Sequence, residues 1–208
     1  MFKEQVPELN ISLKSAIHQL SPIEKDIFRF LEIGVAQGHT TYRTVEELKN
    51  FRGGNFEVHC CDPFKSYWEK QSRDEEKTYK EFLELNSSNI EEGFLFFGRE
   101  PSSKFLTDLA HNGKAESFHI VYVDGAHDAL SVMRDFILSD ILLKPGGVII
   151  FDDYTWISRA EREYVDKQNG IRHPCHSPAA SIDFIKNTLT NSYEFLLDNG
   201  TTPVFIKR

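Results

Sequence analysis

Short apolar runs that alternate with segments of helical spacing constrain the fold of this chain more than any other feature. The apolar runs have about the length of β-strands and cover residues 27–34, 56–62, 93–98, 118–125 and 147–153. The segments between them repeat apolar residues at the spacing of one helix face, and they cover residues 40–51, 101–113 and 129–143. Because strands alternate with helices, we expect an α/β fold: a Rossmann-like, mostly parallel sheet with helices on both faces.

The C-terminal part of the chain departs from this alternation. Residues 183–190 predict a final helix, and the sequence after them predicts two strands joined at Asp198-Asn199-Gly200. An Asn-Gly pair favours the tight turn of a hairpin, so the last strand should run antiparallel to its neighbour. Pro203 cannot donate a backbone hydrogen bond, and we expect it at the first residue of that strand.

Nothing in the sequence divides the 208 residues, so we expect a single domain spanning residues 1–208. Residues 1–26 precede the first strand and are expected to form a helical extension. Two further segments, 65–92 and 154–180, fit no core element. Both follow strand ends, where open α/β sheets bind ligands, so we interpret them as insertions that form a substrate lid.

Composition and charge argue against several functional classes. The formal net charge is −8 without a Lys/Arg-rich run, which disfavours nucleic acid as a partner. No apolar run approaches the roughly 20 residues that span a bilayer. The first ten residues show neither the apolar region nor the cleavage site of a signal peptide, so we do not expect secretion. Cys60, Cys61 and Cys175 lack the spacing of a disulfide framework, which indicates reduced thiols in a cytoplasmic protein. A small-molecule substrate is therefore the favoured partner.

A glycine turn follows the first predicted strand. The strand ends near Glu32, and Gly34 and Gly38 flank a tight turn before a helix that begins near Thr40. Glycine allows positive φ and a close approach by a ligand, so this turn is a candidate cofactor site. Tight packing between strand and helix is the alternative explanation. A dinucleotide fingerprint would need glycine at Ala36, which disfavours NAD.

Asp62 ends the second predicted strand, 24 residues after Gly38. An acid at this position is well placed to accept hydrogen bonds from ribose hydroxyls, and the usual spacing in nucleotide-binding folds is about 20 residues. The alternative is a turn former or a helix cap before Pro63. Together with the glycine turn, the ribose interpretation is favoured.

Three carboxylates follow two later strands. Asp124 ends the fourth apolar run, and Asp152 and Asp153 end the fifth. Because neighbouring strands bring their carboxyl ends together, we expect these acids to converge, and a bound divalent ion would offset their repulsion. Oxygen ligands favour Mg²⁺, with Ca²⁺ or Mn²⁺ as alternatives. The other interpretation makes Asp153 a cap and leaves Asp152 solvated.

Two side chains near these acids have open roles. His127 is a surface residue, a base or a group that orients a ligand, and the sequence does not separate these roles. Trp156 either stacks on a substrate or packs within its own segment.

Several motifs together resemble a known family. They are "LEIGVAQG", "CDPF", "VDGAHDALSVMRD", "LLKPGGVIIFDDY" and the terminal hairpin, in this order along the chain. The chain resembles the class I S-adenosylmethionine-dependent methyltransferases, and within them the metal-dependent O-methyltransferases of the catechol and macrocin type. The resemblance covers roughly residues 27–208. It implies a seven-stranded sheet whose last strand is antiparallel.

The resemblance also implies roles for individual residues. The positions that match the family's S-adenosylmethionine site are Glu32, Gly34, Gly38, Asp62, Gly98, Arg99 and Asp124, with Gly98 and Arg99 at the adenine. The positions that match its metal ligands are Asp124, Asp152 and Asp153. The proton of the acceptor hydroxyl would leave to His127 or to Asp124. A carboxylate at position 153, as in the macrocin type, favours a sugar or aliphatic hydroxyl over a catechol.

The implied function is S-adenosylmethionine-dependent methyl transfer to a hydroxyl of a small molecule, either a sugar or another metabolite. Mg²⁺ or another divalent cation is expected to assist by lowering the pKa of that hydroxyl. One alternative is a metal-independent methyltransferase that acts on nitrogen or carbon. The other is a binding domain that has lost the transfer chemistry. A homodimer is the default oligomer.

Overall fold

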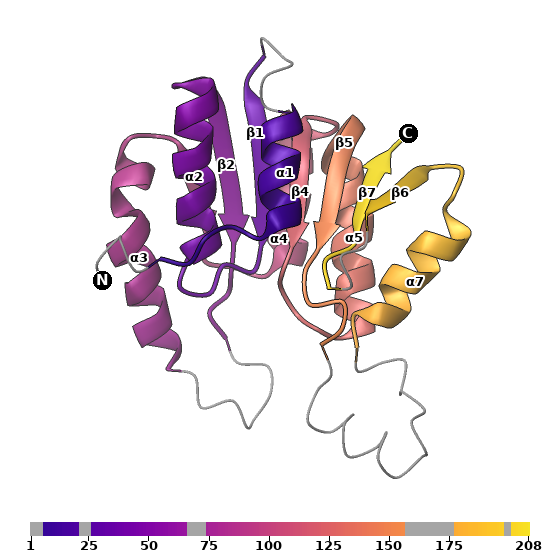
Figure 1. Ribbon diagram of the computed structural model, residues 1–208. Helices are drawn as coiled ribbons and strands as arrows, with labels where there is room; N and C mark the ends of the chain where they lie inside the picture. The colour runs from indigo at the N-terminus through magenta and orange to yellow at the C-terminus, as the bar shows by residue number, and fades with distance from the viewer. Residues whose placement is uncertain (1–5, 21–25, 66–73, 157–176, 198–200) are drawn as a thin grey trace.

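The computed structural model describes residues 6–20, 26–65, 74–156, 177–197 and 201–208. Within them the chain forms a seven-stranded sheet in the order β3-β2-β1-β4-β5-β7-β6 (Figure 1). The strands are β1 (Phe28–Ile33), β2 (Phe56–Cys61), β3 (Leu95–Gly98), β4 (Phe118–Val123), β5 (Leu143–Phe151), β6 (Tyr193–Leu197) and β7 (Val204–Lys207). The helices are α1 (Ile11–Leu20), α2 (His39–Arg52), α3 (Glu75–Glu91), α4 (Ser102–Leu109) with a π-helical turn after it (Ala110–Lys114), α5 (Ala129–Leu142) and α7 (Ala179–Thr188). The predicted α/β fold is confirmed.

The strand directions also agree with the prediction. β1 lies between β2 and β4 and runs parallel to both, and β3 and β5 continue this parallel arrangement outward. β7 runs antiparallel to both of its neighbours, β5 and β6. Pro203 lies just before β7 rather than at its first residue, and its carbonyl accepts a hydrogen bond from the Phe151 amide at 3.1 Å. The predicted turn at residues 198–200 lies outside the described residues.

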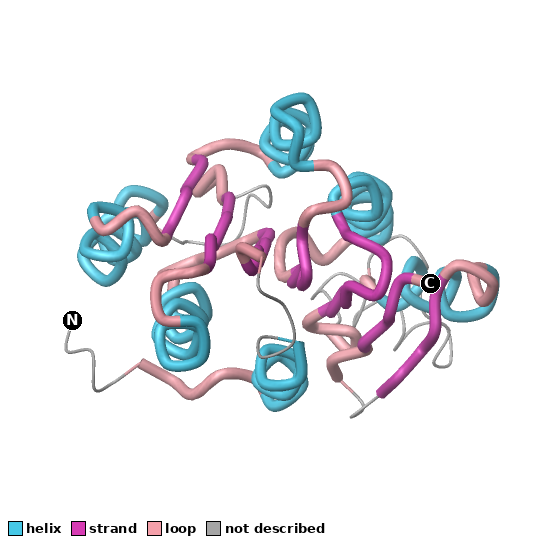
Figure 2. The backbone as a smooth tube through the Cα atoms, turned by 90° about the horizontal axis from the view of Figure 1, so that it is seen from above, coloured by secondary structure: helices cyan, strands magenta, loops and turns pink. Residues whose placement is uncertain are grey.

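Two layers of helices cover the sheet, one on each face (Figure 2). The helices α1, α2 and α3 pack on one face, and α4, α5 and α7 pack on the other. Alternate residues of β4 contribute to both cores, with Tyr122 in the first and Val121 and Val123 in the second. Burial on both faces explains why the strands are nearly continuous apolar runs in the sequence.

The segment 65–92 is only partly an insertion. Most of it is α3, and the side chain of Phe82 in this helix is fully buried against the sheet. The expectation that the whole segment lies outside the core was therefore wrong, because charged residues on the outer face of α3 masked its narrow apolar stripe. Residues 66–73 and 157–176 lie outside the described residues, and the lid remains a prediction for them.

The ends of the chain contribute two further core helices. α1 lies in the N-terminal extension, and its Leu13 and Ile17 are fully buried in the first layer. α7 begins at Ala179, which is four residues earlier than predicted and inside the segment 154–180. Both helices therefore belong to the layers that support the sheet.

The expectation of reduced thiols can be compared with the structure at Cys60 and Cys61. Cys60 and Cys61 are free and buried at the end of β2. Burial raises the pKa of both thiols, so they stay protonated at neutral pH. Cys175 lies outside the described residues.

Among the helices that the structure describes, none is both long and apolar enough to cross a membrane.

Candidate active site

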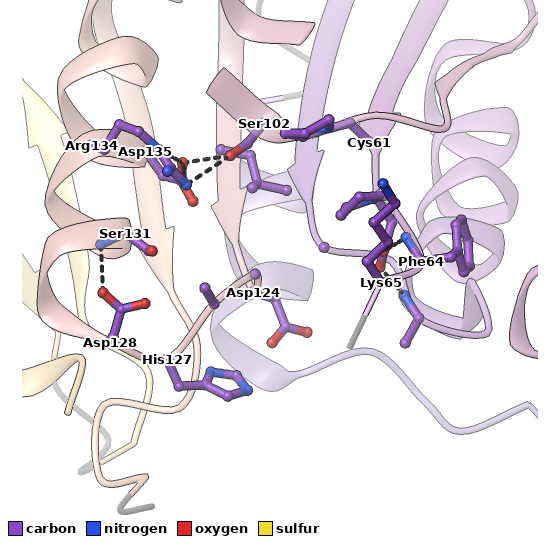
Figure 3. Close-up of a pocket in the computed structure, with 18 of the residues that line it drawn as sticks. Cys61, Phe64, Lys65, Ser102, Asp124, His127, Asp128, Ser131, Arg134 and Asp135 are labelled. Atoms are coloured by element: carbon purple, nitrogen blue, oxygen red, sulfur yellow. Dashed lines mark hydrogen bonds and ion pairs between the residues drawn. The ribbon is translucent and has the colours of Figure 1, made fainter. Parts of the chain in front are cut away.

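A cavity of about 480 Å³ opens at the carboxyl edge of the sheet, next to the ends of β1, β2 and β4 (Figure 3). Its wall includes Gly34 from the glycine turn, Asp62 after β2, Ser102 at the start of α4, and Asp124 and His127 after β4. Open α/β sheets bind their ligands at this edge, and the volume suits a small metabolite or cofactor. The structure thus gathers four of the predicted site residues around one cavity.

The glycine turn is held by packing as well as by backbone conformation. Gly34 has a φ of 84°, and a Cβ on it would lie 2.2 Å from the carbonyl oxygen of Asp124. Gly38 has a φ of 78°, and a Cβ there would lie 2.4 Å from Nδ2 of Asn86. The alternative explanation of close packing therefore holds for both glycines. Gly34 still borders the cavity, as does Ala36, whereas Gly38 lies behind it.

Asp62 shapes the same turn through its carboxylate. One oxygen, Oδ2, accepts hydrogen bonds from the amides of Val35 and Ala36, each at 3.1 Å. The other, Oδ1, accepts from the amide of Phe64 at 2.6 Å. Asp62 is therefore the turn former that the sequence left open as an alternative. A carboxylate oxygen can accept two hydrogen bonds, so Oδ1 keeps capacity for a ligand hydroxyl in the cavity.

Glu32 is buried behind the turn rather than on the cavity wall. Its Oε2 accepts a hydrogen bond from the hydroxyl of Thr41 at 2.6 Å. Burial raises the pKa of Glu32 to about 8, and this effect outweighs the opposing hydrogen bond from Thr41. Glu32 is therefore protonated at neutral pH in the structure as it stands.

Asp124 is one of the acids that line the cavity. It follows β4, and its backbone amide donates to the carbonyl of Ile33 at 2.8 Å, which places its side chain beside the glycine turn. Burial, followed by the negative charges of Asp152 and Glu32, raises the pKa of Asp124 well above its usual range. The predicted repulsion among acids at this edge is thus present, and it favours a proton on Asp124.

The three predicted metal ligands lie at one edge of the sheet but do not form a ligand cluster. Asp152 accepts a hydrogen bond on Oδ2 from the hydroxyl of Tyr122 at 2.5 Å. Its Oδ1 accepts from the amide of Asp153 at 2.9 Å. Within the described ranges, no three His, Cys, Asp or Glu side chains are placed to hold a metal ion. The arrangement does not fit a metal centre as it stands, so the ligand set of Asp124, Asp152 and Asp153 remains a prediction.

His127 borders the cavity and has two neighbours. Its Nε2 lies 3.6 Å from Oδ2 of Asp153, and its ring centroid lies 4.6 Å from that of Trp156. Burial lowers the pKa of His127 below its usual value, against the opposing charge of Asp153. The imidazole is therefore neutral near pH 7 and able to accept a proton from a bound hydroxyl.

The predicted adenine contacts lie outside the cavity wall. Gly98 ends β3 and packs against Phe105, so that a Cβ on it would lie 2.5 Å from that ring. Arg99 forms an ion pair with Glu76 and lies over the ring of Tyr79, 4.1 Å from its centroid. The wall is formed instead by Ser102, three residues further along.

Sequence reasoning missed a polar group in this wall. Asp135 is 1% exposed and accepts a hydrogen bond from the Ser102 hydroxyl at 2.7 Å, and Nη2 of Arg134 lies 3.3 Å from the same carboxylate. All three residues line the cavity. The available signal was a charged residue on the apolar face of a predicted helix, between Val132 and Phe136. Such a residue requires a partner when it is buried.

Comparisons with known proteins identify the family. Residues 31–154, more than half of the chain, match a family described as methyltransferase domain. The chain belongs to this methyltransferase family. The prediction of a class I S-adenosylmethionine-dependent methyltransferase is confirmed.

Solved structures with the same fold include several O-methyltransferases. One is a Staphylococcus aureus protein assigned as a caffeoyl-CoA O-methyltransferase, with a TM-score of 0.61 and 16% identity over 99% of this chain and 87% of that one. Another is CalS11, a TDP-rhamnose 3'-O-methyltransferase of calicheamicin biosynthesis, with a TM-score of 0.61 and 12% identity over 95% and 77% of the two chains. The same fold is found in MycE, a methyltransferase of the mycinamycin biosynthetic pathway solved with Mg and SAH, with a TM-score of 0.60 and 17% identity over 94% of this chain and 48% of that one. At these identities the likeness concerns the fold. A search of curated protein sequences with this chain found no match.

Proposed function

We propose that the methyltransferase transfers the methyl group of S-adenosylmethionine to a hydroxyl of a small molecule, either a sugar or another metabolite. The observation that carries this proposal is the position of His127, whose neutral imidazole faces the same cavity as the glycine turn and Asp62. A cofactor along the turn and an acceptor beside His127 would share one enclosed space. The Staphylococcus aureus protein and CalS11, which share this fold, are both described as O-methyltransferases, and this supports the choice of a hydroxyl.

In this proposal the wall residues divide between binding and proton transfer. Gly34 and Asp62 hold the methionine and ribose parts of the cofactor, and Glu32 and Gly38 support the turn from behind. Gly98 and Arg99 stay proposed adenine contacts, although the cavity wall begins beyond them. Asp124 completes the proposed cofactor site.

The transfer itself needs an oriented and deprotonated hydroxyl. The sulfonium of the cofactor already activates the methyl group, so the protein must hold the acceptor oxygen in line with it. His127 accepts the proton at Nε2 or Nδ1, while the nearby Asp153 carboxylate stabilises the imidazolium that results. Asp124 is the alternative base, and burial together with the nearby negative charges raises its pKa above the usual range.

Assistance by a divalent cation is a separate proposal. The candidate ligands are Asp124, Asp152 and Asp153, and Mg²⁺ is the expected ion for oxygen ligands. Support comes from the three acids at one sheet edge and from the Mg in the MycE structure. Because Asp152 is engaged with Tyr122, no step above depends on the ion. The same observation favours the alternative of a metal-independent methyltransferase.

The proposed partners follow from the net charge of the chain. A net charge of −8 supports a small-molecule acceptor and disfavours nucleic acid and anionic membranes. A homodimer and a cytoplasmic location remain predictions.

Isothermal titration calorimetry with S-adenosylmethionine, in Mg²⁺ and in EDTA, tests the proposal. We expect saturable cofactor binding in both solutions. The absence of binding in both would refute the proposed methyl donor. For the ion, Mg²⁺ titrated into the cofactor complex should bind wild type more tightly than Asp152→Asn, and equal affinities would refute the ligand set.

A further inference from the structure

We propose that Tyr122, which lies outside the cavity, positions His127 through a chain of contacts that runs over Asp152 and Asp153. This inference rests on the proposed function, because His127 is the proton acceptor there. Tyr122 touches neither cofactor nor acceptor, so it is a positioning residue. The contacts join β4, β5 and the segment after β5.

The first link is the hydrogen bond between Tyr122 and Asp152. Tyr122 is 1% exposed in the core between the sheet and α1, and its hydroxyl donates to Oδ2 of Asp152. Burial and the charge of Asp152 raise the pKa of Tyr122, so the phenol keeps its proton and acts as donor. A second and longer contact comes from the Thr202 hydroxyl, 3.5 Å from Oδ1. Asp152 is thus oriented by two residues that lie outside the cavity wall.

The second link sets the backbone of Asp153. Its amide donates to Oδ1 of Asp152 at 2.9 Å, and its φ is 57°, in the left-handed region. Aspartate adopts this region more readily than most residues, yet a local hydrogen bond is needed to hold it there. Because both oxygens of Asp152 are engaged, rotation of that carboxylate would release the amide of Asp153.

The third link joins Asp153 to the imidazole. Oδ2 of Asp153 lies 3.6 Å from Nε2 of His127, and its carbonyl accepts a hydrogen bond from the amide of Trp156 at 2.8 Å. The Trp156 ring lies beside the His127 ring, with 4.6 Å between centroids. Asp153 therefore acts on His127 in two ways. Its side chain lies beside the imidazole, and its backbone carbonyl holds the segment that carries the Trp156 ring.

The consequence is that a buried phenol fixes the direction of the proposed base. A base must lie within hydrogen-bond reach of the proton it removes, and small displacements reduce the rate steeply. Loss of the Tyr122 hydroxyl would free Asp152, relax Asp153 and leave His127 with two mobile neighbours.

Histidine-ring NMR of the full-length protein tests this chain without cofactor or acceptor. The protein contains eight histidines, and His127→Gln assigns the His127 signals. The test variant is Tyr122→Phe, which removes one hydroxyl and keeps the ring. The matched control is Tyr193→Phe, because the Tyr193 hydroxyl donates to Asp140 at 2.6 Å on another part of the sheet. Ring signals are compared at one fixed pH.

We expect Tyr122→Phe to shift the His127 ring signals more than those of any other histidine, because the Trp156 ring current acts on them. Tyr193→Phe should leave them at their wild-type positions. Unchanged His127 signals in folded Tyr122→Phe would overturn the inference, and so would equal shifts in both variants. Where Tyr122→Phe does not fold, Asp152→Asn decides in the same way, because its single carbonyl oxygen cannot occupy the positions of both Oδ1 and Oδ2. Absent cofactor binding refutes the proposed function and leaves this NMR result unaffected, so the two failures are distinguishable.

Discussion

The hydroxyl of Ser102 donates a hydrogen bond to the buried carboxylate of Asp135, and 2.7 Å separates the two oxygens. The pair joins the first turn of α4 to the middle of α5 in the wall of the cavity. Burial raises the pKa of Asp135, while this hydrogen bond and Arg134 oppose the shift. The buried carboxylate of Asp135 in the cavity wall therefore depends on the few hydrogen bonds that it accepts.

Ser102→Ala should destabilise the fold by about 1–3 kcal/mol, because it removes one partner of a buried carboxylate. Urea unfolding measures this free energy. Ser103→Ala is the matched control. Within the described residues the Ser103 hydroxyl makes no hydrogen bond, and alanine keeps the backbone carbonyl that accepts from Thr107, so the change should cost less than about 0.5 kcal/mol. Equal costs for the two variants would contradict the role of the Ser102–Asp135 contact.

Gly34→Ala should destabilise the protein and weaken cofactor binding, because the new Cβ would meet the Asp124 carbonyl at 2.2 Å. The control is Gly93→Ala, whose φ of 80° is similar but whose Cβ would meet nothing within 4 Å. The control carries only the strain of positive φ, about 1–2 kcal/mol. Thermal unfolding and calorimetry should find a larger loss at Gly34. A loss no greater than at Gly93 would show that the close approach is unimportant.

Glu32 should make stability fall as pH rises. Its folded pKa is raised from 4.5 to about 8, so the folded state holds a proton that the unfolded state releases between these values. The contribution is full below pH 4.5 and is lost as pH rises through about 8. Unfolding of wild type and Glu32→Gln is compared from about pH 5 to about pH 9. The difference between them should change with pH in this direction, and a constant difference would contradict the raised pKa.

Glu57 should contribute stability of the opposite pH dependence. Burial alone would raise its pKa, but hydrogen bonds from Lys114, His59 and Arg29 outweigh burial and lower the pKa to about 2. The contribution is present above pH 4.5 and is lost as pH falls toward about 2. Lys114→Gln should therefore destabilise the protein at neutral pH and progressively less in acid. Its cofactor affinity should match wild type, because Lys114 lies outside the cavity wall.

The parallel core and the antiparallel end could be predicted because their signals are local. Strands buried on both faces need apolar residues throughout, and Asn199-Gly200 marks a hairpin without reference to the rest of the chain. α3 was mistaken for an insertion for a related reason. Its buried stripe is narrow, and only packing against the sheet distinguishes Phe82 from the charged surface around it.

The candidate site divides in the same way. Gly34, Asp62, Asp124 and His127 were predicted at the carboxyl edge, where the strand order places them around one cavity. The pairing of Ser102 with Asp135 was not predicted, because these residues lie 33 positions apart on separate helices. The hydrogen bond from the Tyr122 hydroxyl to Asp152 was not predicted either, and it competes with the expected cation for the same carboxylate.

The sequence by itself determined the parallel core strands, the antiparallel last strand and the residues near the end of each core strand. It did so because burial on both faces and turn conformations restrict residue types locally. The tertiary structure alone decided which acids face the cavity, which are protonated and which serve as hydrogen-bond acceptors for the core. Those properties depend on the direction of each side chain and on its distance from other charges and from water, and no residue's immediate neighbours in sequence specify them.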